Sequence, residues 1–272
     1  MVPDEDVLVV ACGGAAKNAL KIINSEDDDP WQMHQAAMEE FGHRFEVLSS
    51  RFSTVPMDDP EKIRQCMEGK RVVVPFSILG GDVGTDIIKE VIRCARDIGC
   101  KVVSVFGIPM GWEPDRRERA FRALPEVASL SDCCLVVDMQ KLMDVNLEFD
   151  TNRFWKAFLK MSDNLIRSSI WSIVEYMQGP FFTVFTERMY AFVVSTDVLP
   201  VNAVLRSWGH LMFDNNPALD SLVIMVGANI TTPEIEEIRN RMVIESGIMP
   251  EVIRRNDPDD SKVMIFRAVR SF

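Results

Sequence analysis

The chain has 272 residues, 47% of them hydrophobic and 26% charged, which is enough to bury a core in one large domain or two smaller ones. Its formal net charge of -11, without a basic stripe, argues against binding to nucleic acid. No stretch reaches the roughly 18 apolar residues that a membrane span requires, and the acidic N-terminal residues are unlike a signal peptide, so we expect a cytoplasmic protein with no membrane span.

The first half of the chain alternates apolar strand patterns with helical periodicity. The clearest unit is an apolar run at 71–79, a glycine turn, a helix with one apolar face at 87–95 and a strand at 102–106. Such a unit implies a parallel sheet, and the alternation predicts a doubly wound, mostly parallel α/β nucleotide-binding domain over residues 1–150. The other elements expected here are strands at 7–10, 44–48 and 134–138 and helices at 15–23, 31–41, 59–67 and 115–124.

A long helix without internal Pro or Gly is expected at 154–177, ending before Gly179-Pro180. At more than about twice the average helix length, it would link two domains. We therefore assign residues 151–179 to a long central helix and residues 180–272 to a smaller C-terminal α+β domain. In that domain we expect strands at 190–195, 221–226 and 262–267 and helices at 201–213 and 233–245.

Glycine-rich turns follow two of the expected strands. The first contains Gly13 and Gly14, and the second runs from Gly80 to Asp86 as Gly-Gly-Asp-Val-Gly-Thr-Asp. Glycines between a strand and a helix let backbone N–H groups approach an anion at the helix N-terminus. Two such turns predict that one nucleotide binds between them.

The glycine turns, the long central helix and the smaller C-terminal unit together resemble the FtsZ and tubulin superfamily of GTP-binding cytoskeletal proteins, over nearly the whole chain. The resemblance implies a divergent and shortened FtsZ-like protein of the cytoskeleton or of cell division. It also implies binding of GTP or GDP, with Mg2+ as a candidate companion ion, and self-association or a place in an FtsZ-like filament.

Several residues match nucleotide-binding positions of that family. Asn18 falls where a helix-borne Asn contacts guanine, and its amide can both donate and accept. Phe158 would correspond to the Phe that stacks on guanine, and Ser162 to the Asp or Asn one turn later. By resemblance, the expected nucleotide-binding residues are Gly13, Gly14, Asn18, Gly80, Gly81, Gly84, Thr85, Glu113, Arg117, Phe158 and Ser162.

Two of these matches have an alternative explanation. Glu113 and Arg117 keep the spacing of a family pair that contacts the ribose and the nucleotide, but an i,i+4 ion pair on a surface helix would look the same in the sequence. Phe158 has the residue type of an ordinary core position, and Asp163 beside Ser162 would point about 100° away on a helix.

Asp82, Val83 and Asp86 depart from the family signature Gly-Gly-Gly-Thr-Gly-Thr-Gly, and two of them are acidic. Two carboxylates near a triphosphate repel it unless a cation such as Mg2+ intervenes or the side chains turn away. For Asp86 we favour a carboxylate that complements the helix dipole over a magnesium ligand. Lys17 beside the first turn either faces solvent or binds phosphate.

The groups that orient water in the family are replaced. Where the family has Asn-x-Asp-x-x-Asp, the ungapped match puts Phe185 and Arg188 at carboxylate positions, and the segment after Arg188 is shorter than in the family. We therefore assign no catalytic residue and expect weak or no GTP hydrolysis.

Other chemistry finds little support in the sequence. The six cysteines have no Cys-x-x-Cys spacing and the three histidines form no metal-type cluster, so we expect reduced structural thiols and no metal centre built from these side chains. The alternatives left open are a nucleotide-free FtsZ-like scaffold or interaction module, and a Rossmann-type oxidoreductase, for which the Gly-x-Gly-x-x-Gly spacing is lacking.

Overall fold

The computed structural model describes residues 7–16, 60–140, 189–195, 201, 222–254 and 263–270. In chain order the described strands and helices are β1 (Val7–Ala11), α3 (Pro60–Met67), β2 (Val72–Ile78), α4 (Gly84–Asp97), β3 (Lys101–Ile108), α5 (Pro114–Ser129), β4 (Cys133–Asp138), β5 (Met189–Ser195), β6 (Leu222–Val226), α9 (Thr232–Ser246), β7 (Glu251–Arg254) and β8 (Val263–Arg270). From β1 to β4 the described strands and helices alternate, as expected for an α/β protein.

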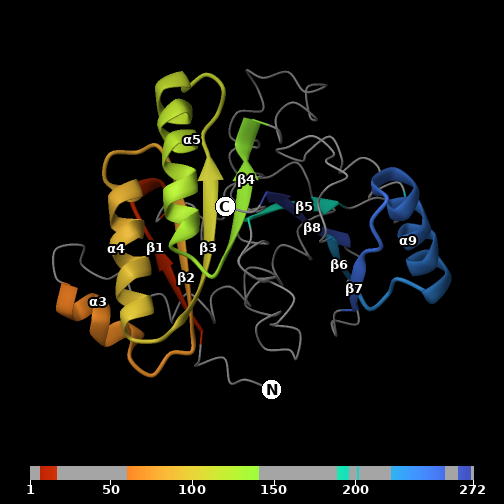
Figure 1. Cartoon of the computed structure of the whole chain (residues 1–272), viewed down its shortest axis with the longest axis horizontal. Helices are drawn as coiled ribbons and strands as arrows, with labels where there is room; N and C mark the ends of the chain where they lie inside the picture. The colour runs from red at the N-terminus through yellow and green to blue at the C-terminus, as the bar shows by residue number, and fades with distance from the viewer. Residues whose placement is uncertain are drawn as a thin grey trace, which may run out of the picture.

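The described strands form one sheet, in the order β1-β2-β3-β4-β5-β8-β6-β7 (Figure 1). The strands β1 to β5 pair in parallel, β8 runs antiparallel to β5 and β6, and β6 is parallel to β7. The expected α/β class with a mostly parallel sheet is therefore confirmed. The direct pairing of β4 with β5 makes the sheet continuous between the two halves of the chain, while the domain boundaries at 150 and 179 stay a prediction.

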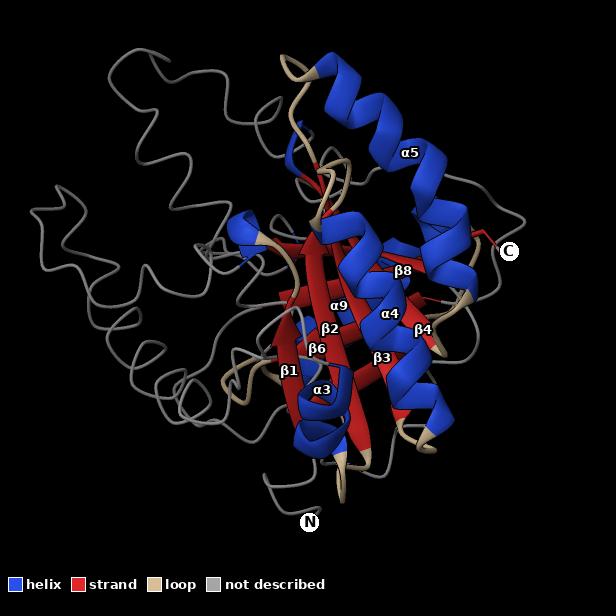
Figure 2. Ribbon diagram, turned by 90° about the vertical axis from the view of Figure 1, so that its left-hand side faces the viewer, coloured by secondary structure: helices blue, strands red, loops and turns tan. Residues whose placement is uncertain are grey.

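The helices α3, α4 and α5 lie together on one face of the sheet (Figure 2). Apolar side chains of α4, such as Ile88 and Ile92, join a single buried cluster with Val73, Val102 and Phe106 of the strands. Strand residues of the opposite alternation are also buried; they include Val9, Val74, Val105, Leu135 and Val137. A parallel sheet is usually buried on both faces, which explains why the sequences of these strands are continuous apolar runs.

The helix α5 is longer than the sequence predicted. We expected it to end near residue 124, but it continues through Pro125 to Ser129. Proline removes one backbone donor and usually ends a helix. Here the last turn places Val127 and Ala128 in the core, and their burial offsets the lost hydrogen bond.

The strand β7 was not expected from the sequence. It has four residues, of which only Ile253 is buried, and it pairs with β6 at the edge of the described sheet. A strand this short and exposed has too little alternation of apolar and polar residues to be predicted from the sequence. The neighbouring helix α9 was expected, and it begins with a capping box between Thr231 and Glu234 and ends at Gly247 with φ 71°.

All six cysteines lie in the described residues and carry free thiols. Cys133 and Cys134 begin β4 and are fully buried, and burial raises the pKa of both thiols, which keeps them protonated. Cys100 donates to the carbonyl oxygen of Lys70 at 3.1 Å. These surroundings agree with the structural role expected from the sequence.

Some expected elements fall outside the described residues. They are most of the helix at 15–23, the helix at 31–41, the strand at 44–48, the long helix at 154–177 and the helix at 201–213 apart from residue 201. None of the described helices is long and apolar enough to cross a membrane.

Candidate functional site

The two glycine turns meet beyond the carboxyl ends of β1 and β2, which are adjacent parallel strands. Gly13 has φ 91°, and a Cβ placed on it would lie 2.9 Å from the Cα of Gly84. A Cβ on Gly84 would in turn lie 3.2 Å from the carbonyl oxygen of Cys12. The backbones of the two turns are therefore in direct contact, as only glycines allow, at the edge where ligands bind in open α/β sheets.

Gly14 and Gly81 differ from the glycines at this contact. A Cβ on either would meet no described atom within 4 Å, so their outer faces are open. We call Gly13, Gly14, Gly81 and Gly84 the anion cradle, because backbone N–H groups at such turns bind anions. Val83, the N-cap residue of α4, has no hydrogen-bonding side chain, so it cannot satisfy the N–H groups of the first helical turn.

Gly80 and Thr85 hold the second turn in place. Gly80 has φ 80°, and a Cβ on it would lie 1.9 Å from the carbonyl oxygen of Arg116, inside the first turns of α5. Its N–H donates to Oγ1 of Thr85 at 3.1 Å. Both residues were expected from the resemblance to contact phosphate; in the described contacts they shape the turn, and phosphate contact stays a prediction.

The two carboxylates of the second turn have different surroundings. Asp82 forms an ion pair with Arg119 of α5, so its side chain is directed toward that helix. Asp86 lies in the first turn of α4, where a carboxylate complements the helix dipole, as we favoured from the sequence. Among the described residues, no group of three or more His, Cys, Asp or Glu side chains could hold a metal ion by itself.

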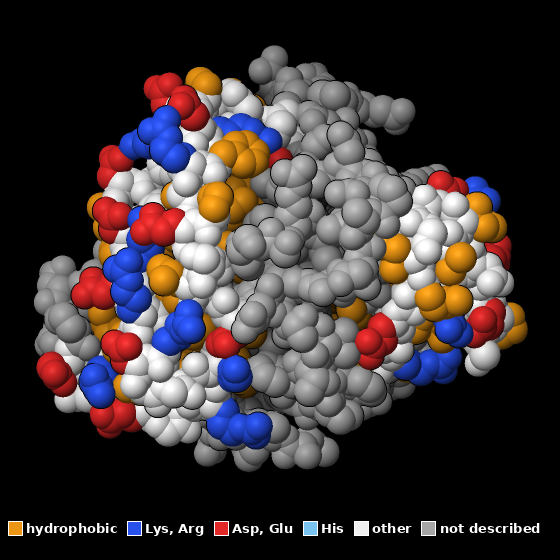
Figure 3. Space-filling view, viewed as in Figure 1, with side chains coloured by type: hydrophobic (Ala, Val, Ile, Leu, Met, Phe, Trp, Pro, Cys, Tyr) orange, Lys and Arg blue, Asp and Glu red, His pale blue; other side chains and the backbone are white. Residues whose placement is uncertain are grey.

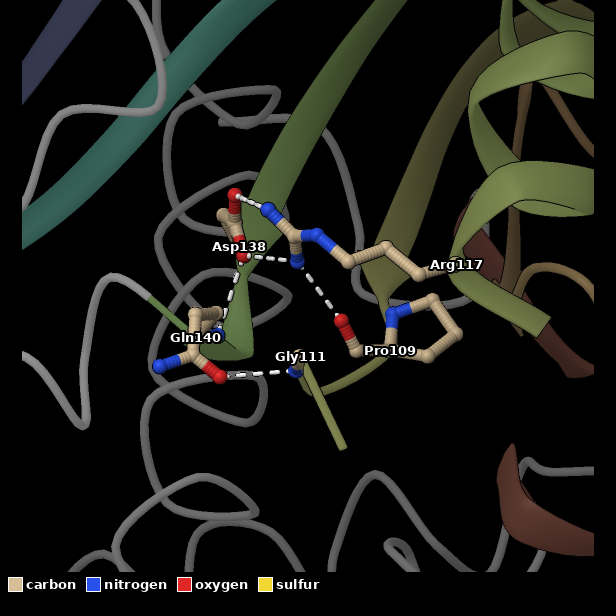
Figure 4. Close-up of polar contacts among 5 residues, drawn as sticks. All are labelled: Pro109, Gly111, Arg117, Asp138 and Gln140. Carbon is tan, nitrogen blue, oxygen red and sulfur yellow. Dashed lines mark hydrogen bonds and ion pairs between the residues drawn. The ribbon is translucent and has the colours of Figure 1, made fainter. Parts of the chain in front are cut away.

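Arg117 connects three segments near the carboxyl ends of β3 and β4 (Figure 4). Its guanidinium donates to both carboxylate oxygens of Asp138, at 2.7 and 2.6 Å, and to the carbonyl oxygen of Pro109 at 2.7 Å. It also lies 4.9 Å from the ring centroid of Phe121. The Asp138 side chain is only 1% exposed, so its bidentate pair with Arg117 is a largely buried contact that joins α5 to the end of β4.

Two residues of this network were missed from the sequence. The backbone N–H of Gln140 donates to Asp138 at 3.0 Å, and the Gln140 side chain accepts from the N–H of Gly111 at 2.7 Å. The one signal that could have identified Asp138 is a charged residue ending an apolar strand. Its buried position requires a basic partner, although the sequence does not show which one.

Glu113 and Arg117 do not form the ion pair considered from the sequence. The Glu113 carboxylate pairs with Arg116 instead, three residues along the helix. The ribose and nucleotide contacts expected for Glu113 and Arg117 stay predictions. Asn18, Phe158 and Ser162, together with Lys17 and the segment 183–188, lie outside the described residues.

Curated proteins similar to the chain carry the name FtsZ, and no family model matches it. The cell division protein FtsZ of Methanothermobacter thermautotrophicus is 24% identical over 197 residues, covering 70% of this chain and 48% of that protein. The cell division protein FtsZ 1 of Pyrococcus horikoshii is 25% identical over 208 residues, covering 66% of this chain and 52% of that protein. The chain thus spans about half the length of these curated relatives.

Solved structures of the same class match 97% of the chain. An empty FtsZ dimer from M. jannaschii has a TM-score of 0.67 at 16% identity, over 88% of that chain. A CetZ from Methanosaeta thermophila has a TM-score of 0.64 at 12% identity, over 86% of that chain. TubZ of Bacillus thuringiensis, in GDP-form protofilaments, has a TM-score of 0.61 at 12% identity, over 87% of that chain. The fold is that of FtsZ, CetZ and TubZ.

The resemblance expected from the sequence is thereby confirmed. The chain is similar in sequence to FtsZ, at 24% and 25% identity to two curated proteins, and it has the fold of FtsZ, CetZ and TubZ.

Proposed function

We propose that the chain binds a guanine nucleotide, GTP or GDP, in the anion cradle, and that it acts as an FtsZ-like or tubulin-like protein of the cytoskeleton or of cell division in the cytoplasm. The observation that carries the proposal is the backbone contact between Gly13 and Gly84, with the open faces of Gly14 and Gly81 beside it. The similarity to proteins named FtsZ, and to TubZ in GDP-form protofilaments, supports the same class of ligand.

The residues of the cradle fit a polyphosphate. Gly13 and Gly84 let the two turns touch, a Cβ on Gly14 or Gly81 would meet no described atom within 4 Å, and α4 begins at Gly84 with its dipole directed at the same place. Asp82, one of the two acidic residues noted in the sequence, forms an ion pair with Arg119. Mg2+ commonly binds through phosphates plus one or two carboxylates, for which Asp86 is the one candidate in this turn.

Hydrolysis is expected to be weak or absent. Phe185 and Arg188 stand where the family carries carboxylates, and neither side chain can orient and polarise an attacking water. We therefore propose a nucleotide-bound protein that self-associates, or joins a filament of an FtsZ-like partner, with slow turnover of the bound nucleotide.

Isothermal titration with GTP, GDP and ATP tests the binding. The sharpest variant is Gly81→Val, because a side chain at this open position meets no described atom and should fill the cradle without disturbing the fold. We expect it to abolish binding of the guanine nucleotides that the unaltered chain binds. Gln65→Val adds the same side chain at an exposed position of α3, a helix remote from the cradle (Figure 2), and should leave binding unchanged.

The outcome that would overturn the proposal is a well-folded chain that binds neither GTP nor GDP at millimolar nucleotide. The alternative, a nucleotide-free FtsZ-like scaffold or interaction module, is favoured by the acidic residues Asp82 and Asp86 in place of glycines. The two are separated by chromatography of the supernatant after gently purified protein is denatured, because only a nucleotide-binding chain releases a guanine nucleotide.

A further inference from the structure

The ion pair between Asp82 and Arg119 joins the second glycine turn to α5 at an exposed position. The Asp82 side chain is 84% exposed and that of Arg119 is 47% exposed. Ion pairs with this much contact with water contribute little to folding stability. We therefore expect the pair to affect the charge and the orientation of the second glycine turn rather than the stability of the fold.

The geometry of the turn explains why the pair forms. Gly80 lies against α5, since a Cβ on it would be 1.9 Å from the Arg116 carbonyl oxygen. Arg119 follows Arg116 by three residues, so both lie on the same side of the helix. Asp82 is thereby directed toward α5, which follows β3, and away from the first glycine turn, which follows β1 on the other side of β2.

We propose that Arg119 is a positioning residue of the anion cradle: by holding Asp82 it draws that carboxylate away from the bound polyphosphate and cancels its charge. This inference rests on the proposed nucleotide binding. It explains how a glycine turn can carry an acidic residue and still accept an anion, since like charges at close range repel strongly unless they are compensated.

On the described surface of α4 and α5, several basic side chains are already paired with acidic ones. Acidic and basic side chains are interspersed over the face formed by α4 and α5 (Figure 3). On this face Lys89 pairs with Glu126, and Arg122 pairs with Glu118. Because these neighbours already compensate one another, the affinity of the cradle for an anion depends on the local Asp82–Arg119 pair.

Titration calorimetry with GDP and with inorganic triphosphate, at low and high NaCl, tests the inference. In Arg119→Ala the carboxylate of Asp82 is released, and we expect affinity to fall by about fivefold to tenfold at low salt, with a smaller loss at high salt because ions screen the repulsion. The double variant Asp82→Asn with Arg119→Ala should return to within about twofold of the unaltered chain, because neither charge remains. Arg119→Lys keeps the charge and should retain most of the affinity.

Arg122→Ala is the matched control, since it breaks another exposed ion pair of α5 and should change affinity by less than about twofold. Thermal unfolding of each variant checks that the fold is kept. The inference is overturned if Arg119→Ala binds like the unaltered chain, or if the double variant is as weak as Arg119→Ala, which would mean that Arg119 contacts the anion itself. If the unaltered chain binds neither ligand, the proposed function fails as well, so the two failures are distinguishable.

Discussion

At the scale of single residues, the glycines of the two turns divide into those that allow backbone contact and those that leave space. Gly80 belongs to the first kind, with φ 80° and the Arg116 carbonyl oxygen where a side chain would begin. Gly81, its neighbour, belongs to the second kind. The sequence motif alone gives these residues the same role, whereas their surroundings give Gly80 a structural role and leave space in front of Gly81, where we propose that the ligand lies.

Replacing Gly80 by Ala should therefore destabilise the fold strongly. The positive φ costs about 1 kcal/mol or more, and the overlap with the α5 backbone adds about 1–3 kcal/mol because one of the two segments must shift. Gly69→Ala is the matched control, since Gly69 has φ 76° but open space in front of it, and it should show the conformational cost alone. Urea unfolding measures both variants, and equal stability losses would contradict the close packing of the turn on α5.

At the scale of elements, α9 shows how strongly a local sequence signal can define a helix boundary. The Thr231 side chain accepts from the N–H of Glu234, and the Glu234 carboxylate accepts from the Thr231 hydroxyl at 2.6 Å and from its backbone N–H at 2.7 Å. These bonds, first the side-chain one and then the backbone one, lower the pKa of the Glu234 carboxyl below its usual value.

The capping box predicts a pH dependence for α9. Because the pKa of Glu234 is lower in the folded state than in the unfolded state, its contribution to stability is present above the unfolded pKa and is lost as pH falls through the folded pKa.

Thr231→Ala should cost about 1 kcal/mol of folding stability near neutral pH, because the N-cap is lost. It should also raise the pKa of Glu234, measured by carboxyl carbon shifts in NMR titration. Thr232→Ala, one residue into the helix, should leave that pKa unchanged; an unchanged pKa in Thr231→Ala as well would refute the cap.

Elements with strong periodicity could be located from the sequence, and contacts between distant segments could not. The apolar runs of β2, β3 and β4 and the apolar face of α4 identify the parallel sheet because burial determines their composition. The pairing of Arg117 with Asp138, 21 residues apart, depends on how α5 packs beside β4. The Asp82–Arg119 pair is likewise set by the packing of a turn on a helix, so from the sequence Asp82 could only be seen as an uncompensated charge.

At the scale of the whole molecule, the glycine turns keep their backbone contact, whereas the segment that the resemblance aligns with water-orienting carboxylates does not keep those carboxylates. Gly13 and Gly84 are in contact, while Phe185 and Arg188 stand where the resemblance expects carboxylates. General acid or base groups that position water contribute about 100-fold or more to the rate of hydrolysis. A chain without them should therefore hydrolyse bound GTP far more slowly than an active family member.

Phosphate release with GTP should accordingly be at least about 100-fold slower than that of an active FtsZ assayed in parallel, while pelleting with GTP reports whether the chain assembles. Gly81→Val is the background control, because a chain that cannot bind nucleotide gives the spontaneous rate. Restoring the carboxylates with Phe185→Asp and Arg188→Asp should raise phosphate release, because a carboxylate can orient and polarise an attacking water. If the unaltered chain releases phosphate as fast as the active FtsZ, another group orients the water. Glu187 lies in the same segment and is the first residue to replace in that case.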